Sequence, residues 1–251
     1  MQKLFITLQH SINRLKDMKR KKWIVKYLSE FIIIVLGITV SFWVNQLSIN
    51  AQNNQERIKV LNSLKKEADE IYEYCQERKL NWNQDILILN SLLDDKSSII
   101  KSENINKSRI QFNLIYYRVF EPPTDRYHSI INSGHLKYIR SDKIKELISK
   151  LHITYSTYVQ TNIQHEKELR EDLLKLILNT HPNFILDKFN QNISFKEYYN
   201  TLNTAVSEDD KLQASLILLR DYQKNRTKWL ELYLALVEDL NNEIEVVLNI
   251  N

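Results

Sequence analysis

Glycine is nearly absent from this chain of 251 residues, since it occurs only at Gly37 and Gly134, and proline occurs three times. Sheets need tight turns, and tight turns draw on glycine, proline, asparagine and aspartate. Rossmann and P-loop folds also need clustered glycines to cradle a phosphate, which two distant glycines do not provide. Charged residues make up 26% and hydrophobic residues 43% of the chain, as in an ordinary folded protein. We therefore expect an all-α fold of long helices joined by polar loops.

The positive charge of the chain is concentrated at its N-terminus. Residues 1–26 contain eight lysines and arginines against the single acid Asp17, whereas the chain as a whole carries only +4. The remainder is therefore mildly acidic, which argues against nucleic acid as a partner. Residues 3–18 also place Leu4, Phe5 and Leu8 on one helical face, as in a helix lying on an anionic leaflet. A frayed basic segment is the alternative.

A long uncharged run follows this basic segment. The 14 residues Phe31–Val44 carry no charge, and extending the helix to residues 27–48 gives it the length to cross a bilayer core of about 30 Å. Trp23 and Trp43 suit the two interfaces. A buried core helix and a cleavable signal peptide are the alternatives, the latter disfavoured by its long basic segment. The positive-inside rule then predicts a single-pass protein of the bacterial inner membrane, with a cytoplasmic N-terminus and a periplasmic C-terminal domain.

A polar stripe runs along the predicted membrane helix. Glu30, Gly37, Ser41 and Asn45 fall within an arc of about 80° on a helix. Gly37 and Ser41 form a small-x-x-x-small pair, which lets two helices approach closely. We expect these four residues to form a face for self-association, with Lys26 pairing Glu30 one turn earlier. The alternative is that Glu30 and Asn45 simply mark the two ends of a short span.

Apolar residues continue at helical spacing beyond the membrane. No glycine or proline interrupts residues 38–121, so the membrane helix is expected to continue into a stalk helix ending near Asp94. The lone cysteine, Cys75, lies in this apolar stripe, which indicates a core residue rather than a nucleophile. A polar loop is expected over residues 94–106. Residues 110–120 alternate like a strand but are assigned to a helix, because no partner strand is expected.

The segment that follows is predicted to form a corner. Pro122 and Pro123 end one helix, and Thr124 or Asp125 caps a short helix that ends at Gly134. This corner is also a candidate surface for a protein partner, through Pro123, Tyr127, Ser133 and Gly134. The plain alternative is a helix-capping turn, which needs the same residue types.

The rest of the chain predicts long antiparallel helices. One runs from Ser141–Asp142 to His181–Pro182, and Ser194 with Glu197 forms a capping box for the next. The last helix is expected from beyond Ser207 to about Leu248. Its leucine-rich stripe, interrupted at Gln223 and Arg226, is typical of coiled-coil-like packing.

No motif predicts catalysis. A single cysteine excludes an internal disulfide and a multi-cysteine zinc site, and no H-E-x-x-H or G-x-S-x-G motif is present. We therefore expect no cofactor, no metal and no enzymatic activity. A hydrolase or metal enzyme that uses His128 and His135, beside Asp125, is kept as the alternative.

Two stretches resemble an uncharacterised family of bacterial single-pass membrane proteins, known only as a domain of unknown function. The first is the membrane segment, which matches the family pattern at Glu30, Gly37, Ile38 and Asn45. The second runs from Phe120 to Ile139 and resembles the family pattern F-x-P-x-x-x-T/Y-x-x-L-x-x-S-G-x-L-x-x-I. The resemblance implies a membrane-anchored helical protein and no particular reaction or ligand.

Together these features predict three regions: a basic amphipathic segment over residues 1–26, a transmembrane helix over 27–48 and a helical bundle domain over 49–251. The expected function is that of an oligomeric, non-catalytic membrane scaffold whose bundle binds an unidentified protein partner. The alternative is an oligomeric membrane effector or pore, for example in antiphage defence, that is gated by the helical domain.

Overall fold

The computed structural model describes residues 2–94 and 105–249, with side chains described at residue 23 and from residue 26 onward. Over these residues the chain is helical and contains no strand, which confirms the predicted all-α fold. The chain divides into two compact units, Met1–Arg57 and Ile58–Asn251. Most of the polar loop expected over residues 94–106, and the side chains of the amphipathic face expected within residues 1–26, lie outside the described residues.

The first unit consists of the N-terminal part of α1, a helix that runs from Gln2 to Leu93. It ends where the sequence predicted, next to Asp94. The most apolar stretch of α1 from Lys26 onward has a mean hydropathy of 2.0, and none of that stretch is buried. The helix is therefore long and apolar enough to cross a membrane.

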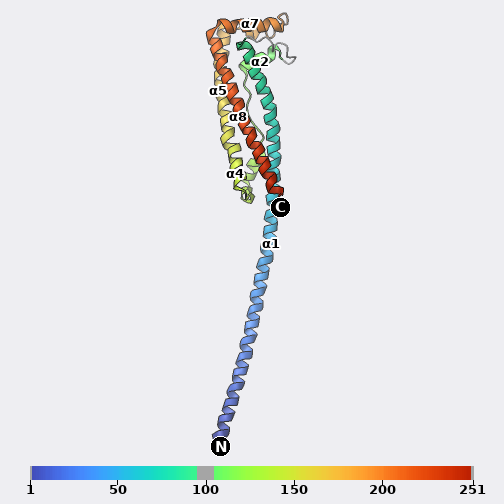
Figure 1. Cartoon of the computed structure of the whole chain (residues 1–251), viewed down its shortest axis with the longest axis vertical. Coiled ribbons are helices and arrows are strands. Elements are labelled where there is room, and N and C mark those ends of the chain that lie inside the picture. The colour runs from blue at the N-terminus through green and yellow to red at the C-terminus, as the bar shows by residue number, and fades with distance from the viewer. Residues whose placement is uncertain (1, 95–104, 250–251) are drawn as a thin grey trace. The chain divides into compact units, whose positions relative to one another are not determined.

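The second unit is a bundle of long helices (Figure 1). The C-terminal part of α1 lies beside α8 (Asp210–Asn249), and the ion pairs Lys65–Glu245 and Lys79–Glu231 show that the two run antiparallel. We call each of the four lengthwise segments of the bundle a leg, and α1 and α8 form two of them. The third leg comprises α4 (Asp142–Ser149), a π-helical segment η3 (Lys150–Tyr155) and α5 (Ser156–Thr180). It packs along α8 over its whole length and also runs antiparallel to it, which confirms the predicted packing.

The remaining leg is only partly helical, which corrects the assignment of residues 110–120 to a helix. α2 covers Lys107–Ile115 and stops at Tyr116, whose backbone is extended, and α3 begins at Asp125 and ends at Asn132. Residues 116–124 between them have no regular secondary structure. An extended chain covers more than twice the length per residue of a helix, and this lets Phe120 reach the rings of Trp82 and Tyr233 in the core.

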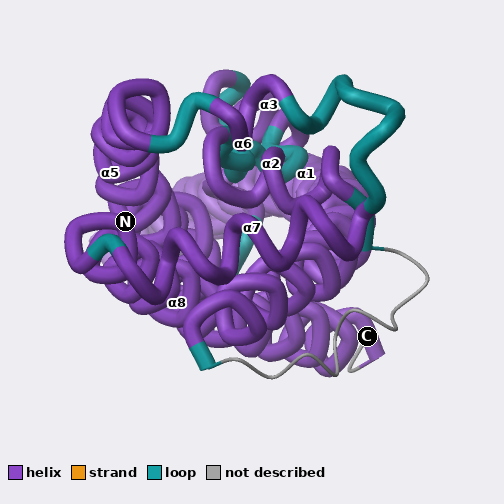
Figure 2. Tube along the Cα trace, turned by 90° about the horizontal axis from the view of Figure 1, so that it is seen from above, coloured by secondary structure: helices purple, strands orange, loops and turns teal. Residues whose placement is uncertain are grey.

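Short elements close the two ends of the bundle. Gly134 has a φ of 69° and links α3 to a 3₁₀ turn, η2 (His135–Tyr138). At the other end, α6 (Asn183–Leu186) and α7 (Phe195–Glu208) follow α5, and α7 crosses the ends of the long helices (Figures 1 and 2). Ser141 and Ser194 act as N-caps, as predicted, because their hydroxyls accept hydrogen bonds from the amides of Ile144 and Glu197.

Candidate functional site

The predicted association face lies on the exposed surface of α1 in the first unit. Glu30, Gly37, Ser41 and Asn45 are all exposed and belong to one continuous helix, so they share one face as the sequence predicted. The Lys26 ammonium lies 3.9 Å from the Glu30 carboxylate, which is the expected pairing one turn apart. Large apolar side chains surround this face, including Phe31 and Phe42 at 64% and 70% exposure. Such exposure of apolar side chains indicates a binding partner or a lipid environment.

Gly37 leaves open space on this face. A Cβ atom placed at Gly37 would meet no atom within 4 Å. Among the residues that the structure describes, the Ser41 hydroxyl and the Asn45 amide have no hydrogen-bond partner, whereas the nearby Thr39 hydroxyl donates to the carbonyl of Val35. The two unpaired groups therefore retain their capacity to bond across a helix–helix contact.

The predicted corner is built from α3 and the turn at Gly134. Tyr127 and Pro123 are half-buried, whereas Ser133 and Gly134 are exposed. The Ser133 hydroxyl donates to the carbonyl of Ser129, so it serves to end α3. Only part of the predicted partner surface is therefore available, because Tyr127 packs against the bundle by stacking on His152 at a ring-centroid distance of 3.9 Å.

The start of α3 is capped by a residue of another helix. Thr124 occupies the N-cap position, as expected, but its side chain makes no capping hydrogen bond. Instead, the buried carboxylate of Glu67 on α1 accepts hydrogen bonds from the amides of Arg126 and Tyr127, at 2.7 and 3.0 Å. Glu70, one turn on, pairs with the Arg126 guanidinium. Two acids of α1 therefore fix the corner to the bundle, and no local sequence pattern predicts these contacts.

The same carboxylate faces a buried histidine. The second Glu67 oxygen lies 3.5 Å from Nε2 of His152, and both side chains are nearly inaccessible, at 2% and 4% exposure. Burial lowers the pKa of His152 to about 4, and the nearby His128 acts in the same direction. Burial raises the pKa of Glu67, which the amides of Tyr127 and Arg126 partly oppose. His152 lies in the π-helical segment, a local distortion that is frequent at functional sites.

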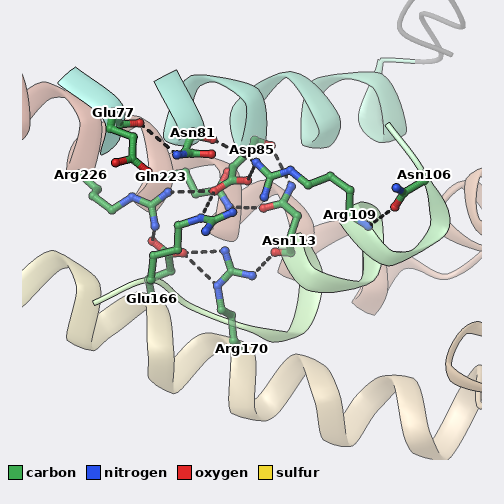
Figure 3. Close-up of polar contacts among 11 residues, drawn as sticks. Glu77, Asn81, Asp85, Asn106, Arg109, Asn113, Glu166, Arg170, Gln223 and Arg226 are labelled. Atoms are coloured by element: carbon green, nitrogen blue, oxygen red, sulfur yellow. Dashed lines mark hydrogen bonds and ion pairs between the residues drawn. The ribbon is translucent and has the colours of Figure 1, made fainter. Parts of the chain in front are cut away.

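A second polar cluster, which we call the charged layer, joins side chains of α1, α2, α5 and α8 (Figure 3). Glu166 of α5 is fully buried, and its two oxygens accept hydrogen bonds from Arg170 at 2.6 and 2.9 Å and from Arg226 of α8 at 2.5 Å. Asp85 of α1 pairs with Arg109 of α2 at 2.6 Å. All four legs contribute to the layer, whose members are Asp85, Arg109, Asn113, Arg118, Glu166, Arg170, Gln223 and Arg226.

Arginines outnumber acids in the charged layer. Asp85 and Glu166 are the only carboxylates among its eight members, which include four arginines. Burial lowers the pKa of Arg226 to about 10, although Glu166 and Asp85 favour its charged form. Its guanidinium also lies over the ring of Trp82, 4.2 Å from the centroid. Buried charges of this kind need partners to be tolerated, so the layer is held together as one network.

In the sequence, this layer is marked only by the polar residues Gln223 and Arg226, which interrupt the apolar stripe of α8. Gln223 and Arg226 occupy positions of the α8 stripe, at a spacing of three to four residues from Leu219 and Leu230, and all four are fully buried. Polar residues at these core positions were the sequence signal that could have predicted a buried polar cluster. Their partners on other helices carry no comparable signal, because Asp85, Glu166 and Arg170 look like ordinary surface charges in a sequence.

The structure does not bring the predicted histidines together as a metal centre. In the ranges 2–94 and 105–249, no group of three or more histidine, cysteine, aspartate or glutamate residues is placed to hold a metal ion. His128 is exposed and His135 half-buried at the corner. An open pocket of about 520 Å³ lies elsewhere, between α7 and the α5–α6 junction, where His181 and Asp209 pair at 2.9 Å.

Comparisons with known proteins add no relative. No protein-family model, curated protein or solved structure matches this chain. The resemblance to an uncharacterised membrane-protein family therefore remains a prediction that rests on the membrane segment and on residues 120–139.

Proposed function

We propose that this protein is a non-catalytic scaffold anchored in a bacterial inner membrane by one helix. The observation that carries the proposal is the exposed apolar part of α1, where large apolar side chains from Leu28 to Leu47 are 42% or more exposed on a helix long enough to span a bilayer. The bundle then serves as a binding domain for a protein partner. The basic residues before the span favour a cytoplasmic N-terminus and a periplasmic bundle.

Self-association is the second part of the proposal. Open space at Gly37 and unpaired polar groups at Ser41 and Asn45 lie on one face of α1, and this combination favours close contact with a second copy of the helix.

Cysteine crosslinking in membranes tests this contact. With Cys75 replaced by serine, single cysteines at Ser41 and at Thr39 are compared, since these positions lie on roughly opposite faces. Oxidation should crosslink copies through position 41 and not through position 39. Gly37→Leu should abolish the crosslink, whereas Thr39→Leu should leave it intact. Equal crosslinking at both positions would rule out a specific face.

Sidedness is tested separately, because it does not depend on self-association. In the Cys75→Ser background, a cysteine replaces the exposed Asn225 on α8. Intact cells are treated with a membrane-impermeant thiol reagent. Labelling supports a periplasmic bundle. Protection that ends on lysis places the bundle in the cytoplasm and makes the predicted orientation wrong.

The second candidate function is a gated membrane effector. Ser41 and Asn45 favour it, because unpaired polar groups on an oligomeric helix face are able to line a conducting path. Expression should then depolarise the membrane, and Gly37→Leu should restore its potential. An unchanged membrane potential in cells where the Ser41 crosslink forms would leave the scaffold as the remaining candidate.

A further inference from the structure

The bundle has two separate apolar cores. The first, which we call the Ile71 core, includes Leu61, Ile71 and Leu240. The second, which we call the Leu216 core, includes Leu89, Leu202 and Leu216. Among the described residues, no buried apolar side chain belongs to both cores. Along α1, α5 and α8 the charged layer lies between the two cores. On α1, for example, Asp85 falls between Trp82 of the Ile71 core and Ile88 of the Leu216 core.

The charged layer adds little net free energy to the coupling between the two cores. The desolvation of buried ion pairs offsets much of their attraction, so such pairs add little net stability compared with apolar packing. A continuous apolar core is what usually makes a bundle unfold as one unit, and here it is interrupted. The three long helices pass through the layer, but a helix alone is only marginally stable in water.

Among the described residues the Leu216 core is the smaller of the two, with 15 buried apolar side chains against 22 in the Ile71 core, and α2, α6 and α7 supply seven of the 15. Its walls include α2, α6 and α7, and only the last of these exceeds nine residues. Its tie to α1 includes a hydrogen bond from the Tyr199 hydroxyl to the carbonyl of Ser91. The Ile71 core is instead lined mainly by the long helices and is fixed to α3 through Glu67.

From this arrangement we propose that the Leu216 core opens as a unit while the Ile71 core stays packed, with the charged layer as the boundary between them. Local opening of contiguous units is a general property of proteins. Opening would expose Tyr198, Tyr199 and Leu202, which the closed bundle buries. This conformational step is independent of the membrane anchor and of self-association.

Hydrogen exchange on the full chain in lipid nanodiscs tests the proposal. Two variants on α8 form a matched pair, because Leu216 and Leu240 are both at least 99% buried and lie on opposite sides of the layer. Amides of α1 report on both cores, residues 61–71 on the Ile71 core and residues 88–92 on the Leu216 core. In the unaltered protein, amides 88–92 should exchange faster than amides 61–71.

The two variants should differ in a specific way. In the half-open state the Leu216 core is open and the Ile71 core is still packed. Leu240→Ala destabilises the closed and the half-open state equally, so the opening that exposes residues 88–92 costs the same and their exchange should not change. Full unfolding becomes easier, so exchange at residues 61–71 should speed up by about 30-fold or more. Leu216→Ala should speed exchange at residues 88–92 by a similar factor.

One result would overturn the proposal. If Leu240→Ala speeds exchange at both sets of amides by the same factor, the bundle opens as one unit. Should either alanine variant fail to fold, Ile244→Val and Ile177→Val replace them, since both isoleucines are buried in the respective cores. The expected changes are then about 2-fold to 10-fold, with the same pattern.

Discussion

Replacing Glu166 by glutamine should strongly destabilise the bundle. Glu166 is fully buried and accepts three hydrogen bonds from the guanidinium groups of Arg170 and Arg226. Glutamine removes the negative charge, leaves Asp85 as the only carboxylate in the layer, and turns an NH₂ group toward cationic donors. Breaking a buried ion pair on one side typically costs about 3–5 kcal/mol in the free energy of unfolding.

Thermal unfolding of the full chain in detergent, followed by circular dichroism, measures this cost. For a domain of this size, about 3–5 kcal/mol corresponds to a Tm lowered by roughly 6–20 °C. The matched control is Glu168→Gln on the same helix, where the side chain is 62% exposed and the expected cost is below about 0.5 kcal/mol. Equal Tm values for the two variants would refute the reasoning, because burial and pairing of Glu166 would then have no energetic consequence.

Three further predictions follow from other parts of the bundle. Burial lowers the pKa of His152 from 6.5 to about 4. The free energy of unfolding should therefore fall by about 3 kcal/mol as the pH drops from 6.5 to 4, because the unfolded chain takes up a proton that the folded chain does not. In chemical denaturation, His152→Asn should remove this part of the pH dependence, whereas His165→Asn, at a half-exposed site, should not. Gly134→Ala should lower the free energy of unfolding by about 1–2 kcal/mol, because φ is 69° there and an L side chain strains the backbone. The added Cβ meets no atom within 4 Å, so no steric clash adds to this cost. Gly134→Asn should lower the free energy of unfolding less in the same assay. Burial raises the pKa of Cys75 to about 12, so its thiol should resist Ellman's reagent at pH 8 in the native protein and react fully in guanidinium chloride.

Local signals in the sequence predicted much of the fold. The absence of glycine and proline after Gly37 correctly indicated one helix to the neighbourhood of Asp94, and Ser141 and Ser194 marked two helix starts through their own hydroxyls. These features depend on residues within a few positions of one another, which a sequence displays directly.

What the sequence did not reveal depends on contacts between distant residues. α2 stops at Ile115 because the following residues extend to place Phe120 against Trp82 and Tyr233, and this packing is invisible in the local pattern. The cap that Glu67 supplies to α3 spans about sixty positions of sequence. Glu30, Gly37, Ser41 and Asn45 lie on one side of α1, and this placement was predictable because helix periodicity alone determines it.

The charged layer also determines how the long helices align along their length. Leucine stripes repeat every three to four residues, so they would pack almost equally well if α8 slid by one heptad along α5. Such a slip would replace Arg226 opposite Glu166 with Leu219 or Tyr233, and the buried carboxylate would lose its partner on α8. A single polar position is known to fix register in coiled coils in this way. The polar residues that interrupt the α8 stripe therefore select one alignment among several that the leucines alone would permit.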